Sequence, residues 1–207
     1  WVAVGFVGDE TLFGLPPGGL RGGEQGILPA VTRLGIKVIS TNLLVKAEDT
    51  AVIWRGPVIS GAIQQFWTDV LWGKLDYLLV DLPPGTSDAA LTVVQSLPLT
   101  GVVLVTTPQD LATLVVRKAM SMLAQLKIPI LGVVENMSYF KCPDCGSIHE
   151  IFGPSHLDEI QQAAGQKLPS VQIPITPGFA ALADTGKIED LKVKEFEAFI
   201  PALLHKS

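Results

Sequence analysis

Short apolar runs alternate along this chain with stretches in which apolar residues recur every three or four positions. The short runs, typical of strands buried on both faces of a parallel sheet, are Val2–Val7, Ile36–Ser40, Tyr77–Val80, Gly101–Thr106 and Pro129–Glu135. The periodic stretches, which predict helices, are Val58–Leu71, Ala89–Gln95, Leu111–Leu126 and Glu195–Leu204. This alternation predicts an α/β fold with a mostly parallel sheet of about six strands and helices on both faces, in a single domain over residues 1–207.

A stretch rich in glycine, Gly14–Gly26, interrupts this pattern and predicts a loop. It does not predict a phosphate cradle, because the sequence contains no Gly-Lys-Ser or Gly-Lys-Thr. Such a loop needs the lysine to reach the phosphates and the hydroxyl to hold magnesium.

Composition narrows the class of protein further. Apolar residues make up 48% of the chain and charged residues 17%. The chain therefore has enough apolar residues to form a core, and disorder is not expected. The net charge of −5 argues against a general nucleic-acid surface. No apolar run is long enough for a membrane span, and the chain opens on Trp1 without a signal peptide. We therefore expect a cytoplasmic chain, and the opening on Trp1 suggests a fragment.

Asp81 directly follows the apolar run Tyr77–Val80. The carboxyl ends of parallel strands border the crevice where open α/β sheets bind ligands, so this carboxylate is placed to hold the water shell of a magnesium ion. Alternatively, Asp81 caps the next helix or starts a turn. The stiff segment Pro83–Thr86 favours the first interpretation, since it lies where a γ-phosphate sensor would be.

Three other positions are candidates for nucleotide contacts. Arg55 precedes a predicted helix and would hold a phosphate or a neighbouring subunit, unless it is simply solvated. Asn136 follows the strand Pro129–Glu135, and its amide offers both a donor and an acceptor to a purine edge, although asparagine is also common in turns. Pro174 follows a last short strand and would flank a base.

Cys142 and Cys145, the two cysteines of the chain, form a Cys-Pro-Asp-Cys-Gly motif in a loop over residues 137–150. Two thiolates at this spacing can bind one metal centre, and Gly146 would let the chain leave in a left-handed conformation. Zinc and iron–sulfur sites usually need four ligands. The set is completed either by His149 and another residue or by the same pair of a second copy across a two-fold axis. A redox role is a third interpretation.

Five motifs in order carry a family signature. They are WRGP (Trp54–Pro57), DYLLVDLPPGTSDAALT (Asp76–Thr92), TTPQD (Thr106–Asp110), ENMSYFKCPDCG (Glu135–Gly146) and HEIFG (His149–Gly153). Together they resemble the Mrp/ApbC family of iron–sulfur cluster carrier proteins, which are deviant P-loop NTPases related to MinD and ParA. The resemblance covers about three-quarters of the chain.

The resemblance implies a P-loop NTPase-like homodimer that binds ATP and magnesium, holds a [4Fe–4S] cluster between two CPxC motifs and transfers it to apo-proteins. Cys142 and Cys145 would be the cluster ligands, and Asp81 the catalytic carboxylate of the Walker B strand. Thr86 and Asp88 would belong to the switch II segment Pro83–Asp88. Asn136 and Pro174 would contact adenine. Arg55 would lie at the dimer or nucleotide face.

One family motif is missing from this sequence. Family members carry a P-loop ending in Gly-Lys-Ser/Thr after a first strand, and this chain has none. The expectation is therefore an iron–sulfur carrier in which the chain alone does not hydrolyse ATP. The alternatives are a non-catalytic, zinc-clamped structural or interaction dimer and a ParA/MinD-like ATP-dependent positioning protein.

Overall fold

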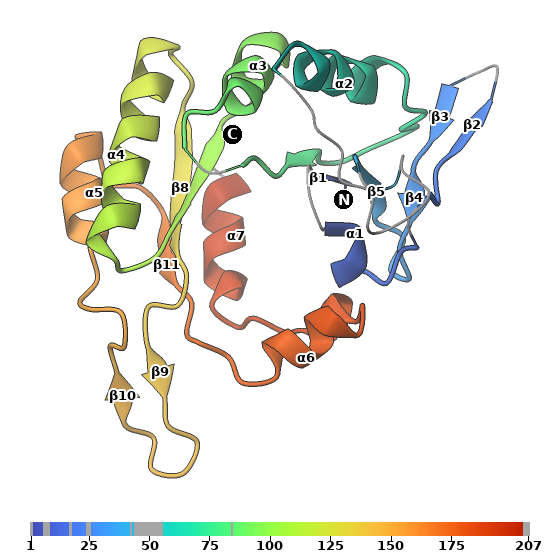
Figure 1. The fold of residues 1–207 in the computed structure, drawn as a ribbon. Coiled ribbons are helices and arrows are strands. Elements are labelled where there is room, and N and C mark those ends of the chain that lie inside the picture. Colours follow the sequence, from blue (N-terminus) through green and yellow to red (C-terminus); the bar gives the residue numbers. More distant parts are fainter. Residues whose placement is uncertain are drawn as a thin grey trace. The chain divides into compact units, whose positions relative to one another are not determined.

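The computed structural model describes residues 2–5, 9–16, 18–23, 26–41, 43, 56–83 and 85–204 (Figure 1). The chain divides into two compact units. Unit 1 comprises Trp1–Pro83, Ser87–Leu97 and Gly178–Lys192, and unit 2 comprises Pro84–Thr86, Pro98–Pro177 and Val193–Ser207. The expectation of a single domain stays a prediction.

The larger sheet of unit 1 has four strands among the residues that the structure describes. In order across the sheet they are β4 (Ala30–Val31), β5 (Lys37–Ser40), β1 (Val2–Gly5) and β6 (Leu79–Val80). β1 pairs in parallel with both β5 and β6, whereas β4 is antiparallel to β5. The prediction that residues 77–80 form one strand buried on both faces is wrong. Only Leu79 and Val80 are strand, since β6 lies at the edge of the sheet among the described residues and pairs with β1 alone. The Leu79 side chain is 53% exposed, so the face of the sheet to which it points is not fully covered there.

The glycine-rich stretch of unit 1 is not only loop, contrary to the sequence-based expectation. β2 (Arg21–Gly23) and β3 (Gly26–Leu28) form an antiparallel ribbon. The ribbon is held by a distant segment: the Ile27 N–H donates to the Asp69 carbonyl at 2.8 Å, and the Leu71 N–H donates to the Ile27 carbonyl at 2.8 Å. This pairing supplies partners to backbone groups that a free loop would leave to water.

The helices of unit 1 are α1 (Asp9–Leu12), α2 (Gly56–Thr68), α3 (Asp88–Ser96), α6 (Phe179–Asp184) and the 3-10 helix η2 (Ile188–Asp190). α3 begins after Ser87, whose hydroxyl accepts the Ala90 N–H at 3.3 Å and so caps the helix. Ser60 of α2 and Thr92 of α3 share a hydrogen bond of 2.9 Å between their hydroxyls.

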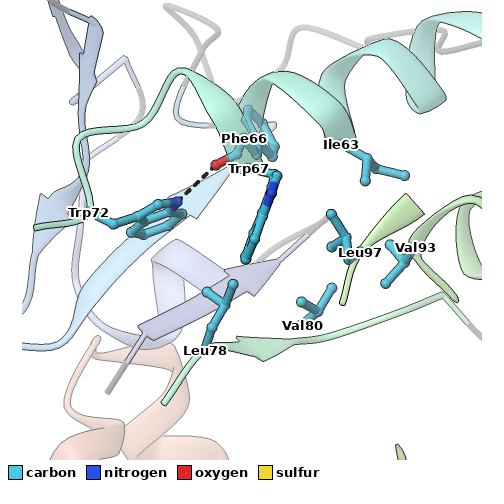
Figure 2. A pocket seen from close by; sticks show the side chains of 8 residues that line it. All are labelled: Ile63, Phe66, Trp67, Trp72, Leu78, Val80, Val93 and Leu97. Atoms are coloured by element: carbon cyan, nitrogen blue, oxygen red, sulfur yellow. Dashed lines mark hydrogen bonds between the residues drawn. The ribbon is translucent and has the colours of Figure 1, made fainter. Parts of the chain in front are cut away.

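One cluster in the core of unit 1 contains two aromatic side chains. Phe66 and Trp72 are buried together with Ile39 and Val70, and the Trp72 indole N–H donates to the Phe66 carbonyl at 2.9 Å. Figure 2 shows these rings beside side chains from α2, β6 and α3, around a cavity of about 10 Å³. The lining is apolar and the space holds at most one water molecule, so this is a packing defect and not a ligand site.

The sheet of unit 2 is entirely parallel, with the order β11 (Ser170–Gln172), β8 (Ile130–Glu135) and β7 (Val102–Thr106). Figure 1 shows α4 (Asp110–Gln125) and α5 (Leu157–Ala164) on one side of this sheet and α7 (Phe196–Leu204) on the other. A hairpin of β9 (Phe140–Lys141) and β10 (Ile148–His149) extends beyond the sheet. The α/β class and the parallel pairing predicted from the sequence are confirmed.

α7 packs directly onto the central strand of unit 2. Phe199 is buried with Val134 and Ile173, and Leu203 borders the same cluster. A Cβ atom built at Gly132 of β8 would lie 2.6 Å from the Leu203 side chain and 3.0 Å from the Phe199 ring. Glycine at position 132 therefore allows the close approach of helix and strand.

None of the helices in the described parts of the chain is both long and apolar enough to cross a bilayer.

Candidate functional site

The cysteine motif occupies the turn of the β9–β10 hairpin. Just after β9, the Cys142 N–H donates to the Ser147 carbonyl at 2.9 Å, and the Gly146 N–H donates to the Cys142 carbonyl at 2.9 Å. Gly146 has φ +74°, so the left-handed conformation predicted from the sequence is confirmed. The hairpin thus presents both sulfurs from one tight turn at the end of an extension from unit 2.

Both thiols are free, and they differ in environment. Cys142 is half-buried and Cys145 is exposed. Cys145 Sγ lies 3.2 Å from Ser147 Oγ. The hydrogen bond with the Ser147 hydroxyl, aided by the Ser147 backbone and by Cys142, lowers the pKa of the Cys145 thiol below its ordinary value. A lowered pKa favours the thiolate, which is the form that binds metals.

The hairpin supplies two ligands and no more from its own surroundings. Within the described ranges, no group of three or more His, Cys, Asp and Glu side chains could hold a metal ion. His149 is exposed on β10, where it pairs with Phe140 across the hairpin. The structure therefore gives no support to the alternative in which His149 and another residue of the same chain complete the site.

A buried carboxylate lies where this extension leaves the sheet. Glu135, the last residue of β8, is fully buried. Its Oε2 accepts the Ser138 hydroxyl at 2.8 Å and the Gln172 amide at 3.0 Å. Its Oε1 accepts the Ser155 hydroxyl at 3.1 Å and the His156 N–H at 3.0 Å. Burial acts to raise the pKa of this carboxyl, but the four hydrogen bonds together outweigh burial and hold the pKa below its ordinary value.

The lowered pKa of Glu135 predicts a specific loss of stability in acid. Because the pKa is lower in the folded chain, the unfolded chain binds more protons as the pH falls. The stabilisation is complete above the ordinary glutamate pKa of about 4.3 and is lost as the pH falls through the lower, folded value. Urea denaturation from pH 7 to pH 3 should show that the difference in the free energy of unfolding between the wild type and Glu135→Gln becomes smaller in acid. A constant difference between the two would contradict this assignment.

Two predicted adenine contacts lie on adjacent segments of unit 2. The Ile173 N–H donates to the Glu135 carbonyl at 2.9 Å, and this pairing places Pro174 beside the chain around Asn136. Asn136 is exposed, and its Oδ1 accepts the Met137 N–H at 2.9 Å. The carboxamide therefore makes a hydrogen bond within the turn, which is the alternative role that the sequence left open. The contacts with adenine stay predictions.

The remaining predicted nucleotide residues are divided between the two units of the chain. Asp81 is exposed after β6 in unit 1, and Asp88 is exposed in the first turn of α3. Thr86 is exposed and belongs to unit 2. Arg55 lies outside the described residues. Asp81 supplies one carboxylate of the kind that magnesium uses, but the loop that would cradle the phosphates is not in this sequence.

Sequence reasoning missed Ser147 and the environment of Glu135. Ser147 follows directly after the Cys-Pro-Asp-Cys-Gly motif, and a hydroxyl so close to a thiol was the available signal. For Glu135 the signal was a charged residue at the end of a continuous buried strand, because such a charge needs partners.

Comparison with known proteins places the chain in a family. The family model described as ParA, the NUBPL iron-transfer P-loop NTPase, matches residues 10–203. The iron-sulfur cluster carrier protein of Methanocaldococcus jannaschii is 52% identical over 132 residues, which are 63% of this chain and 46% of that protein. That of Aquifex aeolicus is 44% identical over 178 residues, 86% of this chain and 48% of that protein. The chain thus spans about half the length of these relatives.

Solved structures agree with this placement. A nucleotide-binding protein from Archaeoglobus fulgidus in complex with ADP superposes with a TM-score of 0.79 at 39% identity, over 96% of this chain and 79% of that chain. The septum site-determining protein MinD of Pyrococcus horikoshii, with a TM-score of 0.61 at 18% identity over 100% of this chain and 82% of its own, shares the fold. The chain belongs to the ParA family of iron-transfer P-loop NTPases.

Proposed function

We propose that this chain is an iron–sulfur cluster carrier that holds a cluster on Cys142 and Cys145 and passes it to apo-proteins in the cytoplasm. The observation that carries the proposal is the pair of free thiols on one exposed hairpin, with the pKa of Cys145 lowered. The relatives named as carriers, which share 52% and 44% identity with this chain, support the same function.

The number of ligands supports sharing of the cluster between two chains. Iron–sulfur clusters of the common types are held by four thiolates, and this chain has two cysteines. An isologous dimer presents the same motif from both subunits at its two-fold axis, so two copies supply four thiolates. We therefore propose a homodimer with one cluster, of the [4Fe–4S] type, between its hairpins.

Exposure of the hairpin suits transfer as well as binding. Cys145 is open to solvent, so an incoming thiolate of a recipient protein can reach the iron that Cys145 holds. Transfer is then an exchange of one thiolate ligand for another at each iron, with no change in the oxidation state of the cluster. The Ser147 hydroxyl stabilises Cys145 as a thiolate when it leaves.

The proposal includes no ATP turnover by these 207 residues. ADP is bound by the structural relative from Archaeoglobus fulgidus, and Asp81, Thr86, Asp88 and Asn136 are the residues that we propose for nucleotide and magnesium contacts. The Gly-Lys-Ser/Thr loop that would hold the phosphates is missing from the sequence.

Anaerobic reconstitution with iron and sulfide tests the proposal. We expect a brown protein that migrates as a dimer and contains about two irons and two sulfides per chain, as four-thiolate ligation of one [4Fe–4S] cluster by two chains requires. A colourless protein that binds zinc as a dimer would overturn the carrier function in favour of a zinc-clamped structural dimer. A brown monomer would overturn the sharing of the cluster.

A further inference from the structure

We infer that Glu135 is a positioning residue that ties both ends of the cysteine-bearing segment, residues 137–155, to the sheet of unit 2, and so determines how the two thiols are presented. This inference rests on the proposed function and deepens it, because it names the group that prepares the cluster site without touching the cluster.

Glu135 lies at a fixed point of the fold. It ends β8, the central strand of its sheet, and pairs with Thr106 of β7 on one side and Gln172 of β11 on the other. The backbone around it is also bonded on both sides: the Asn136 N–H donates to the Thr106 carbonyl at 2.8 Å, and the Glu135 carbonyl accepts the Ile173 N–H at 2.9 Å. A side chain carried here is a rigid anchor for whatever it binds.

The two carboxylate oxygens divide their partners between the two ends of the segment. Oε2 accepts from Gln172 of β11 and from the hydroxyl of Ser138, where the chain leaves the sheet. The Ser138 hydroxyl is shared with the Glu135 backbone carbonyl, which lies 2.7 Å away. Oε1 accepts from the hydroxyl of Ser155 and the N–H of His156, where the chain returns. One side chain thus bridges the departing and returning strands of the extension that carries Cys142 and Cys145.

The other attachments of the segment are unequal at its two ends. The departing end is also paired with the chain after β11, since the Ser138 N–H donates to the Ile173 carbonyl at 3.0 Å and the Tyr139 carbonyl accepts the Ile175 N–H at 2.7 Å. The returning end has the His156 ring, which lies 3.1 Å from Asp110 and 3.2 Å from Glu159. Loss of the carboxylate would therefore loosen the returning end more than the departing end.

The hydrogen-bond donors around Glu135 require a carboxylate at this position. Glu135 accepts four hydrogen bonds from uncharged donors, and it takes part in none of the ion pairs found among the described residues. Glutamine has the same shape, but in either orientation its NH2 group would face an N–H donor, that of His156 or that of Gln172, and would lose that hydrogen bond. Met137, at the start of the segment, has φ +55°, a conformation that a non-glycine residue keeps only when its surroundings enforce it.

Hydrogen–deuterium exchange of the cluster-free 207-residue chain tests this inference. In Glu135→Gln we expect the amides of residues 138–156 to exchange about tenfold faster, as the loss of hydrogen bonds to a charged group predicts. Ser155→Ala changes an exposed residue whose hydroxyl also accepts the Leu157 N–H at 3.3 Å, and should give a smaller acceleration confined to residues near 153–157. Ser155→Thr retains the hydroxyl and should restore wild-type exchange.

A control variant separates positioning from general stability. Leu123→Ala removes a buried side chain from α4 and should leave the exchange of residues 138–156 by local opening unchanged. The inference is overturned if Glu135→Gln and Ser155→Ala exchange like the wild type in this segment, or if Leu123→Ala accelerates it equally. Anaerobic reconstitution of the same variants supplies the second readout: Glu135→Gln should lose visible absorbance that Leu123→Ala retains.

The two readouts distinguish the two ideas. If the wild type takes up no cluster while Glu135→Gln still accelerates exchange, the proposed function fails and the anchoring role of Glu135 stands. If Glu135→Gln accelerates exchange but loads as much cluster as the wild type, Glu135 anchors the segment without governing how the thiols are presented, and that part of the inference is overturned.

Discussion

A Cys145→Ser chain should remain folded and retain less than about a tenth of the cluster that the wild type takes up, because a serine hydroxyl does not ionise near neutral pH and is a poor ligand for iron in these clusters. In a shared site, one substitution removes two of the four ligands, since each subunit carries it. The reconstituted variant should therefore be colourless and should migrate as a monomer. Absorbance, iron content and mass in solution measure these effects together.

His149→Ala is the matched control for the cysteine variant. His149 lies on the same hairpin and is exposed, and the structure assigns it no role as a ligand. This variant should load cluster and dimerise like the wild type. Loss of cluster in His149→Ala would show that the histidine completes the site after all, and full loading in Cys145→Ser would exclude Cys145 as a ligand.

Leu123→Ala should lower the free energy of unfolding by about 2–5 kcal/mol, the range for leucine truncation in a close-packed core. Leu123 is 2% exposed and faces inward from α4. The cost has two parts, the transfer free energy of the lost carbons and the cavity that remains where the neighbours do not collapse.

Leu111→Ala provides the comparison on the same helix with the same chemical change. Leu111 is 72% exposed in the first turn of α4, so its truncation removes little buried surface and should cost less than about 0.5 kcal/mol. Urea denaturation at neutral pH measures the free energy of unfolding of both variants. An unchanged dependence of that free energy on urea concentration is the check on two-state behaviour. Equal destabilisation by the two changes would contradict the burial that the structure gives to this helix.

The elements that sequence reasoning predicted well are those whose pattern is local. The apolar run Pro129–Glu135 became β8 over Ile130–Glu135, and the periodic stretch Leu111–Leu126 became α4 over Asp110–Gln125. The cysteine motif is also local: its last residue is a glycine, and the turn places Gly146 at a positive φ as the sequence predicted.

The features that the sequence did not reveal depend on partners far away in the chain. β3 pairs with β2, and the ribbon is held by a bridge between Ile27 and Val70 that nothing in the glycine-rich stretch predicts. β9 and β10 contain two residues each, too few for a period to be recognised. The partners of Glu135 include Ser155 and Gln172, which lie 20 and 37 residues away, so its role becomes evident only when the sheet brings these residues together.

The contact between α7 and Gly132 limits which amino-acid replacements the chain can accept in evolution. Every replacement of a glycine adds at least a Cβ atom, and at Gly132 that atom would lie 3.0 Å from the Pro169 backbone carbonyl as well as against Phe199 and Leu203. A backbone atom cannot rotate away, so even alanine is expected to be selected against there. At Gly146 no atom lies within 4 Å of an added Cβ, and the constraint is the positive φ alone. Asparagine tolerates that conformation, so we expect it to be an acceptable replacement for Gly146. No replacement is expected to be acceptable at Gly132.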